Sequence, residues 1–191
     1  MKKIIFFFLT IVLLFANCKK EQKSTIINVE KSNKDYAKIG KEYALATKMI
    51  LGKNLKQAIA KEGMIGAMSF CNEQAYSLTD SMQVKYNAII KRVSDKNRNQ
   101  NNKANTTELQ HIATFKEKNK NGEKIKPIIE KSNGKVHFYA PIKTSQLCLQ
   151  CHGKQLQPDL VLKLKDLYPD DLAIGYDDNQ VRGIWSITFN E

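Results

Sequence analysis

A five-residue segment, CLQCH at positions 148–152, constrains this chain more than any other feature. It brings together two of the four cysteines and one of the three histidines in the sequence. The C-x-x-C-H spacing of Cys148, Cys151 and His152 is typical of covalent haem attachment. Two thiols separated by two residues reach the two vinyl groups on one edge of a porphyrin. The next residue, His152, then lies under the iron as an axial ligand.

The N-terminus predicts export. Lys2 and Lys3 precede an apolar run from position 4 to position 16, which only Thr10 interrupts. A helix of that length spans about 20 Å, short of the roughly 30 Å hydrocarbon core of a bilayer. We therefore interpret residues 1–17 as a secretory signal and not as a permanent membrane span. The junction FANC resembles a bacterial lipoprotein signal, which implies lipidation of Cys18; the alternative is ordinary signal cleavage nearby, which leaves Cys18 free or removed.

Export favours haem over other interpretations of the motif, because bacterial c-type haem is attached outside the cytoplasmic membrane. A zinc site needs four ligands, and the sequence has no second C-x-x-C or H-x-x-x-H segment. A thioredoxin-type dithiol is expected beside a helix start in a βαβ unit, which the sequence does not indicate. Chance occurrence is the remaining alternative. If Cys18 carries lipid, three cysteines remain, and an odd count argues against a disulfide framework.

The residues after the signal divide into a tether and one domain. Residues 18–32 are charged and show no sustained hydrophobic period, so we expect a flexible tether. Residues 33–191 are long enough for a single hydrophobic core. The formal net charge is +12, and loss of residues 1–17 removes two lysines and no acid, leaving +10. The lysines are scattered through polar segments, so we expect a solvated basic surface and no nucleic-acid partner.

The hydrophobic pattern predicts an α+β domain with an antiparallel sheet. Apolar residues recur every three or four positions in two N-terminal helices separated by Gly63, and Met68 and Cys71 lie on the apolar stripe of the second. Asn133-Gly134 between two β-rich runs predicts a hairpin. The expected elements are helices at 36–55, 64–82, 107–119 (capped by Thr106 or Thr107) and 159–170 (ended by Pro169), and strands at 85–94, 124–132, 135–143 and 181–189.

Five segments, in order along the chain, resemble one known family. They are GAMSFCNEQA, IKRVSDKNRNQNNKANTTE, VHFYAPI, CLQCHG and YPDDLAIGYDDNQVRGIWSITF, within about residues 60–190. They are similar to the PAS-like c-type haem domain family first described from a thermophilic cyanobacterium. The resemblance implies a PAS-like antiparallel sheet with long N-terminal helices and one covalently attached haem c. It also implies a His/Cys pair of axial ligands, with Cys71 as the second ligand beside His152.

The residues themselves leave the second ligand open. Cys71 lies on an apolar stripe and has no other assigned role, yet small buried thiols are also common in protein cores. Its rivals are Met64, Met68, Met82, His111 and His137. We expect Arg92 and Arg98 to contact the haem propionates, because guanidinium groups suit carboxylates. Arg182 is expected either to do the same or to brace the last strand.

These features predict an exported haem protein, lipid-anchored to a bacterial membrane and facing the periplasm or the cell exterior. We expect a redox or small-ligand sensor, in which Cys71 gives way to another ligand, such as a small gas, on reduction. The alternative is an electron-transfer cytochrome. Either role needs a separate redox or signalling protein as partner. An enzyme such as a peroxidase is less favoured, because a filled sixth position leaves no place for substrate, so we expect no catalytic activity.

Overall fold

A computed structural model describes residues 35–190. The predicted signal peptide (1–17), Cys18 and the tether (18–32) therefore lie outside the described residues. No helix in the described part is long and apolar enough to cross a membrane. The elements follow in the order α1 (Tyr36–Glu73), α2 (Ala75–Tyr86), β1 (Ala88–Val93), the short 3-10 helix η1 (Gln100–Asn102), α3 (Thr106–Lys120), β2 (Ile128–Ser132), β3 (Lys135–Lys143), α4 (Gln146–His152), α5 (Pro158–Leu167) and β4 (Val181–Phe189).

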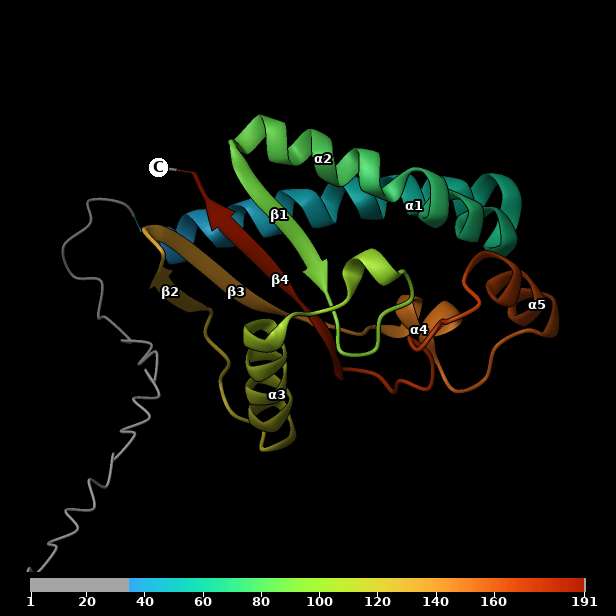
Figure 1. The fold of residues 1–191 in the computed structure, drawn as a ribbon. Helices are drawn as coiled ribbons and strands as arrows, with labels where there is room; N and C mark the ends of the chain where they lie inside the picture. The colour runs from blue at the N-terminus through green and yellow to red at the C-terminus, as the bar shows by residue number, and fades with distance from the viewer. Residues whose placement is uncertain (1–34, 191) are drawn as a thin grey trace, which may run out of the picture.

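The four strands form one antiparallel sheet in the order β1-β4-β3-β2. β2 and β3 form the predicted hairpin, and Asn133 and Gly134 at its turn both have positive φ, 49° and 75°. The last strand, β4, lies between β1 and β3 and pairs with both of them (Figure 1). The α+β fold with an antiparallel sheet that the sequence predicts is therefore confirmed.

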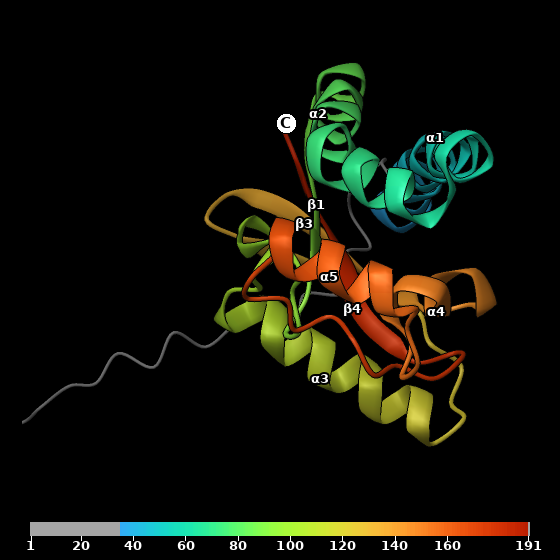
Figure 2. The same cartoon turned by 90° about the vertical axis from the view of Figure 1, so that its right-hand side faces the viewer.

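Helices cover both faces of the sheet. Side chains alternate along each strand, and one set, which includes Ile90 and Ile187, faces α1 and α2 in the larger core cluster. The other set, which includes Tyr139 and Ile184, packs against α3 in a second cluster. Figure 2 shows α1 and α2 on one side of the sheet and α3 on the other. The two short helices α4 and α5 lie at one end of the sheet, beyond the C-terminal end of β1 (Figure 1).

The N-terminal helices end at different residues from those predicted. The interruption at Gly63 is confirmed, with φ 66° and ψ −163° inside α1, a conformation that glycine adopts without steric cost. The predicted helix 64–82 is in fact divided, because α1 ends at Glu73 and α2 begins after Gln74. α2 then continues to Tyr86 and stops at Asn87, which is left-handed (φ 45°). The first strand therefore begins at Ala88 and not at position 85.

Two later helices also differ at their ends. Asn105 caps α3, so the prediction of Thr106 or Thr107 is wrong. The Asn105 side chain accepts a hydrogen bond from the Glu108 amide, and the Glu108 carboxylate accepts one from the Asn105 amide, both at 2.9 Å. This reciprocal box satisfies two free N–H groups at once. α5 ends at Leu167 and not at position 170, because the residue before Pro169 leaves the helical conformation.

Candidate functional site

The three residues of the C-x-x-C-H motif lie on α4. Cys148 and Cys151 are three residues apart on a helix, so their side chains point to one side. Cys151 is buried and Cys148 half-buried, and both are free thiols. Our expectation that no helix starts beside the motif is wrong. All strand pairs of the described sheet are antiparallel, however, so the βαβ context of a thioredoxin-type dithiol does not surround the motif within residues 35–190.

Backbone hydrogen bonds fix α4 to the segment before β4. The Gly175 amide donates to the Gly153 carbonyl and the Tyr176 amide to the His152 carbonyl, both across 3.0 Å. A Cβ atom at Gly153 would lie 2.4 Å from the carbonyl oxygen of Leu149, so this position directly after the motif requires glycine. The motif is thereby held between β3 and the segment that leads into β4.

The His152 ring is oriented by a backbone carbonyl. Its Nδ1 atom lies 2.6 Å from the carbonyl oxygen of Ala173, which can only accept, so Nδ1 carries the proton. Burial lowers the pKa of His152 well below its ordinary value, and Arg182 and Arg98 lower it further. The imidazole is therefore neutral, with an unprotonated Nε2. This is the state in which a histidine binds a metal through Nε2.

Cys71 lies beside the motif although it comes from the other half of the chain. It packs on the apolar cluster formed by Met68, Cys151, Leu160, Leu164 and Tyr168. Burial raises the pKa of the Cys71 thiol, while Arg92, Arg98 and Arg182 lower it. Three arginines are thus close enough to Cys71 for their charges to act on its sulfur. α1, α4, α5 and the ends of β1 and β4 together surround the site.

The rival histidines lie on the opposite face of the sheet. Along β3, Phe138 faces α1 and α2, so His137 faces α3, where its Nδ1 lies 2.9 Å from Thr188 Oγ1. The His111 ring of α3 contacts the Tyr139 ring in a tilted arrangement, and its Nε2 atom lies 3.3 Å from a Glu130 carboxylate oxygen. Among the rival methionines, Met82 belongs to the core cluster between α1, α2 and the sheet, whereas Met64 and Met68 lie near the motif.

Two arginines at the site have no carboxylate partner. Arg92 is the next-to-last residue of β1 and Arg182 the second residue of β4. Both side chains are half-buried, and neither forms an ion pair with an Asp or Glu of residues 35–190. Burial lowers the pKa of each guanidinium, and the charge of Arg182 also lowers that of Arg92. Burying unpaired like charges is costly. The arrangement is that of a site for an anionic group.

A β-bulge explains how Arg182 reaches the site. Ile142 pairs with Gly183, but the next residue, Lys143, pairs with Val181, so Arg182 is left out of the β3–β4 register. A bulge re-aims the side chains around it. Consistent with this, Val181 and Ile184 pack in the same cluster against α3 although a regular strand would place them on opposite faces.

Arg98 has a different environment from Arg92 and Arg182. Its Nε donates to the Asp171 carboxylate at 3.0 Å, and its Nη2 donates to the Cys151 carbonyl at 2.6 Å. The sequence predicts that Arg98, like Arg92, contacts a haem propionate. In the structure, the guanidinium of Arg98 already donates to acceptors of the protein itself. The sequence left open whether Arg182 contacts a propionate or braces the last strand. In the structure, the charge of Arg182 lowers the pKa values of Arg92, Cys71 and His152.

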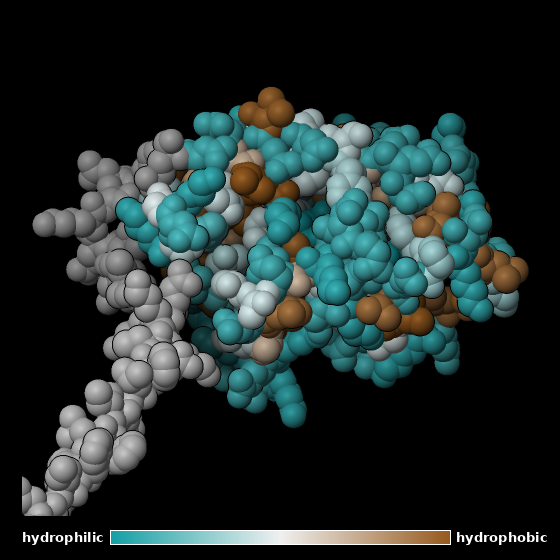
Figure 3. Space-filling view, viewed as in Figure 1, coloured by the Kyte–Doolittle hydropathy of each residue, from teal (hydrophilic) through white to brown (hydrophobic). Residues whose placement is uncertain are grey.

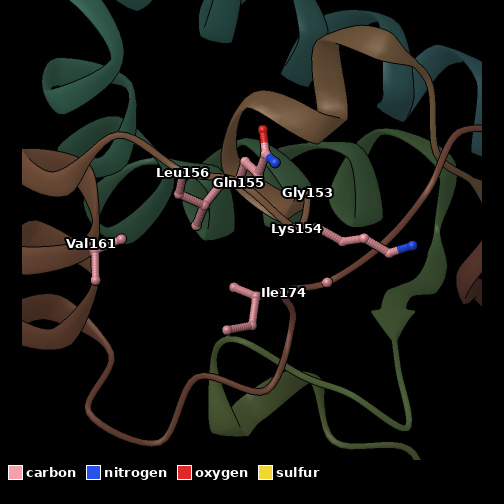
Figure 4. Close-up of a pocket in the computed structure, with 7 residues that line it drawn as sticks. Gly153, Lys154, Gln155, Leu156, Val161 and Ile174 are labelled. Atoms are coloured by element: carbon pink, nitrogen blue, oxygen red, sulfur yellow. The ribbon is translucent and has the colours of Figure 1, made fainter.

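A surface hollow of about 490 Å³ adjoins the C-terminal end of α4. Figure 4 shows Leu156, Val161 and Ile174 around it, with the backbone of Gly153 at its wall. Exposed apolar side chains occur nearby, at Leu162 and Leu172. Figure 3 shows apolar side chains gathered at the end of the molecule that carries α5, on a surface that is otherwise mostly polar. The hollow is separate from the side chains of Cys71 and His152, which do not line it.

The donor set fits a covalently bound porphyrin. Two free thiols lie one helical turn apart, and the next residue offers an unprotonated ring nitrogen. The sulfur of Cys71 supplies a second candidate ligand, and Arg92 and Arg182 supply unpaired cations for carboxylates. Within residues 35–190, no three His, Cys, Asp or Glu side chains gather as a metal-ion cluster, so the zinc interpretation gains no support.

Comparisons with known proteins find one family model and one solved structure that are similar to this chain. A family model described as Tll0287-like matches residues 18–190. Among solved structures, the chain is similar to the crystal structure of the cyanobacterial heme-protein Tll0287, with a TM-score of 0.53 and 17% sequence identity. The match covers 78% of this chain and 95% of that one, and at this identity it shows the shared fold alone. No curated protein matches the chain.

Proposed function

Since the chain belongs to the Tll0287-like family, whose model spans residues 18–190, we propose that it binds one haem c through thioethers to Cys148 and Cys151. The observation that supports this proposal is the arrangement of the side chains around α4. Two free thiols and the unprotonated Nε2 of His152 lie beside two arginines that have no carboxylate partner in the described part of the chain. The related solved protein is described as a heme-protein, which supports the same assignment.

Each polar group at the site then has a role. His152 would supply one protein ligand to the iron, and Cys71, whose sulfur packs near the motif, would supply the other. Arg92 and Arg182 would bind the propionates, which would remove the cost of leaving two half-buried cations unpaired. When bound, haem supplies one-electron redox chemistry and an iron coordination position that can exchange ligands.

We propose that the protein senses redox state or a small ligand and has no catalytic activity. Cys71 lies among apolar side chains, where an anionic sulfur is costly unless a cation compensates it. Ferric iron would compensate a thiolate better than ferrous iron, so a Cys71 ligand would be held less firmly once a redox partner reduces the haem and water protonates the sulfur. A small neutral ligand such as a gas could then take the place of Cys71.

The test is to reduce the purified haem-loaded protein and add carbon monoxide. The sensor proposal expects a carbon monoxide spectrum that forms at the same rate in the wild type and in Cys71→Ala. A ferrous wild type that refuses carbon monoxide, while Cys71→Ala accepts it, would show that Cys71 stays bound. The sensor role would then be wrong, and electron transfer would take its place.

Electron transfer is the second candidate, and the surface beside α4 favours it. Leu162, Leu172 and Ile174 are 70%, 52% and 45% exposed, close to the hollow that adjoins the motif. An exposed apolar surface beside the helix that would hold the cofactor is suited to contact with a partner protein. A carrier of this kind keeps both axial ligands in both oxidation states.

We also propose that the protein is exported and held at a bacterial membrane by lipid on Cys18. The support is the sequence: a basic start, an apolar run of secretory length and a cysteine where that run ends. Residues 1–34 lie outside the described part of the chain. The redox or signalling partner is then a protein at the same membrane or in the adjoining compartment.

A further inference from the structure

Arg98 is held at three acceptors around α4. Its Nε donates to Asp171 Oδ2 at 3.0 Å, and its Nη2 donates to the carbonyls of Cys151 at 2.6 Å and Ala173 at 3.4 Å. The Arg98 and Asp171 side chains are only 11% and 10% exposed. The remaining nitrogen, Nη1, lies 3.9 Å from the sulfur of Met68. All three nitrogens of the guanidinium thus have a protein partner.

These contacts close a ring that includes His152. Ala173 is held through both of its backbone groups: its amide donates to Asp171 Oδ1 at 2.8 Å, and its carbonyl accepts from His152 Nδ1 at 2.6 Å. Asp171 in turn binds Arg98, and Arg98 binds the carbonyl of Cys151, the residue directly before His152. The ring therefore fixes both the backbone that carries the imidazole and the carbonyl that orients it.

Resting on the haem-binding function proposed above, we infer that Arg98 is a positioning residue for the iron ligand His152 and not a partner of the propionates. Arg98 and His152 donate to the same carbonyl oxygen, that of Ala173. A second donor weakens the bond that this oxygen forms with the Nδ1 proton. The imidazole then keeps more of that proton and gives less electron density to iron, which favours the ferrous state.

The contrast with Arg92 and Arg182 supports the assignment. Those two guanidinium groups have no carboxylate partner within residues 35–190, whereas Arg98 already has a buried one. To reach a propionate, Arg98 would have to leave Asp171 buried and unpaired, which is costly. The buried pair is instead suited to holding Ala173 and Cys151 in fixed positions beside the imidazole.

The test compares Arg98 variants in the haem-loaded protein, all in a Cys71→Ala background so that His152 is the protein ligand to ferrous iron. Arg98→Gln removes the cation and its hydrogen bonds. Because this leaves Asp171 unpaired and threatens folding, the double variant Arg98→Gln/Asp171→Asn removes both charges. Lys96→Gln is the matched control, since Lys96 Nζ binds the carbonyl of Ile174, one residue beyond Ala173. The readouts are the midpoint potential and the iron–histidine stretching band in resonance Raman spectra.

Arg98→Gln should lower the potential and raise the iron–histidine frequency, because Ala173 then accepts the His152 proton more strongly. The double variant should raise the frequency as well, with a smaller fall in potential, since no uncompensated carboxylate remains. Arg98→Lys should give a potential and a frequency between those of Arg98→Gln and the parent. Lys96→Gln should give the same potential and frequency as the parent.

The frequency separates the two roles of Arg98. A propionate partner would also change the potential, but it would leave the iron–histidine band unchanged. An unchanged band in both Arg98→Gln and the double variant therefore overturns the inference while leaving covalent haem binding intact. Absence of covalent haem from the parent protein would instead overturn the proposed function itself.

Discussion

Cys71 and Cys151 lie in one apolar cluster, although Cys71 comes from the end of α1 and Cys151 from the motif helix near the other end of the chain. The packing of α1 against α5 and of α4 beside both brings them together. A free, half-buried thiol therefore lies against the same apolar cluster as the C-x-x-C-H motif, which is what the proposed sulfur ligand requires.

Replacing Cys71 should change the iron spectrum without releasing haem. In Cys71→Ala, the thioethers to Cys148 and Cys151 stay, and the low-spin ferric spectrum of the wild type should become high-spin or that of a water or Met68 ligand. Optical and electron paramagnetic resonance spectra measure this. Met82→Leu is the control, because Met82 also carries sulfur but lies in the core cluster between α1, α2 and the sheet. A wild-type ferric spectrum in Cys71→Ala would place the ligand elsewhere.

Removing one of the unpaired arginines should have opposite effects on the two forms of the protein. Arg92→Gln or Arg182→Gln should raise the free energy of unfolding of the haem-free protein by about 1 kcal/mol, because an uncompensated half-buried cation is lost. In the haem-loaded protein it should lower that free energy by about 1–3 kcal/mol, because a charge-assisted hydrogen bond is lost.

Urea unfolding of both forms measures the difference, and Cys148→Ser/Cys151→Ser supplies the haem-free form. Lys91→Gln is the matched control, because Lys91 already pairs with the buried carboxylate of Glu108 at 3.1 Å. It should destabilise both forms alike. Equal effects of Arg92→Gln on the two forms would argue against a propionate partner at this position.

Local signals predicted those parts of the fold that one or two residues determine. Gly63 and the Asn133-Gly134 turn were found in the sequence because their backbone conformations favour these residue types. The end of α2 was missed because Asn87 lies directly before the β-rich run that starts at Ala88, so the strand was predicted to begin at position 85. The start of α3 was missed because Asn105 lies in an asparagine-rich polar stretch where neighbouring residues are equally good caps.

The sequence predicts the candidate thiol and imidazole ligands of the site better than it predicts the roles of the arginines. The C-x-x-C-H spacing points to Cys148, Cys151 and His152 as candidates, and the family resemblance points to Cys71, which also lies on an apolar stripe. The division of roles among the arginines depends on tertiary contacts. A bulge re-aims Arg182, and Asp171, far along the chain, binds Arg98. Neither event leaves a pattern in the neighbouring sequence.

Gly153→Ala should weaken the motif helix. The added Cβ would lie 2.4 Å from the Leu149 carbonyl oxygen, which is backbone and cannot move aside cheaply. Overpacking of this kind costs about 1–3 kcal/mol, and thermal unfolding of the haem-free protein measures it. Gly52→Ala is the control: this helical glycine has open space around it, so the change should stabilise by about 0.5–1 kcal/mol. A neutral Gly153→Ala would mean that α4 is not held as described.

Cys18→Ser should release the protein from the membrane fraction after export. One acyl chain binds a bilayer only marginally, so stable anchoring needs the two or three chains of a lipidated N-terminal cysteine. Fractionation of cells that express each form measures the distribution, and Cys71→Ala, which keeps Cys18, is the control. Unchanged membrane partitioning of Cys18→Ser would require a different anchor.

The most direct test of the central claim is the intact mass of the exported protein after denaturation and acid-acetone extraction. The account predicts a mass equal to the processed chain plus one haem, with haem staining that survives on a denaturing gel. Cys148→Ser/Cys151→Ser should show the mass of the chain alone. A wild-type protein that loses all haem to the extraction would contradict covalent attachment at Cys148 and Cys151, and with it the assignment of α4 as the haem-binding helix.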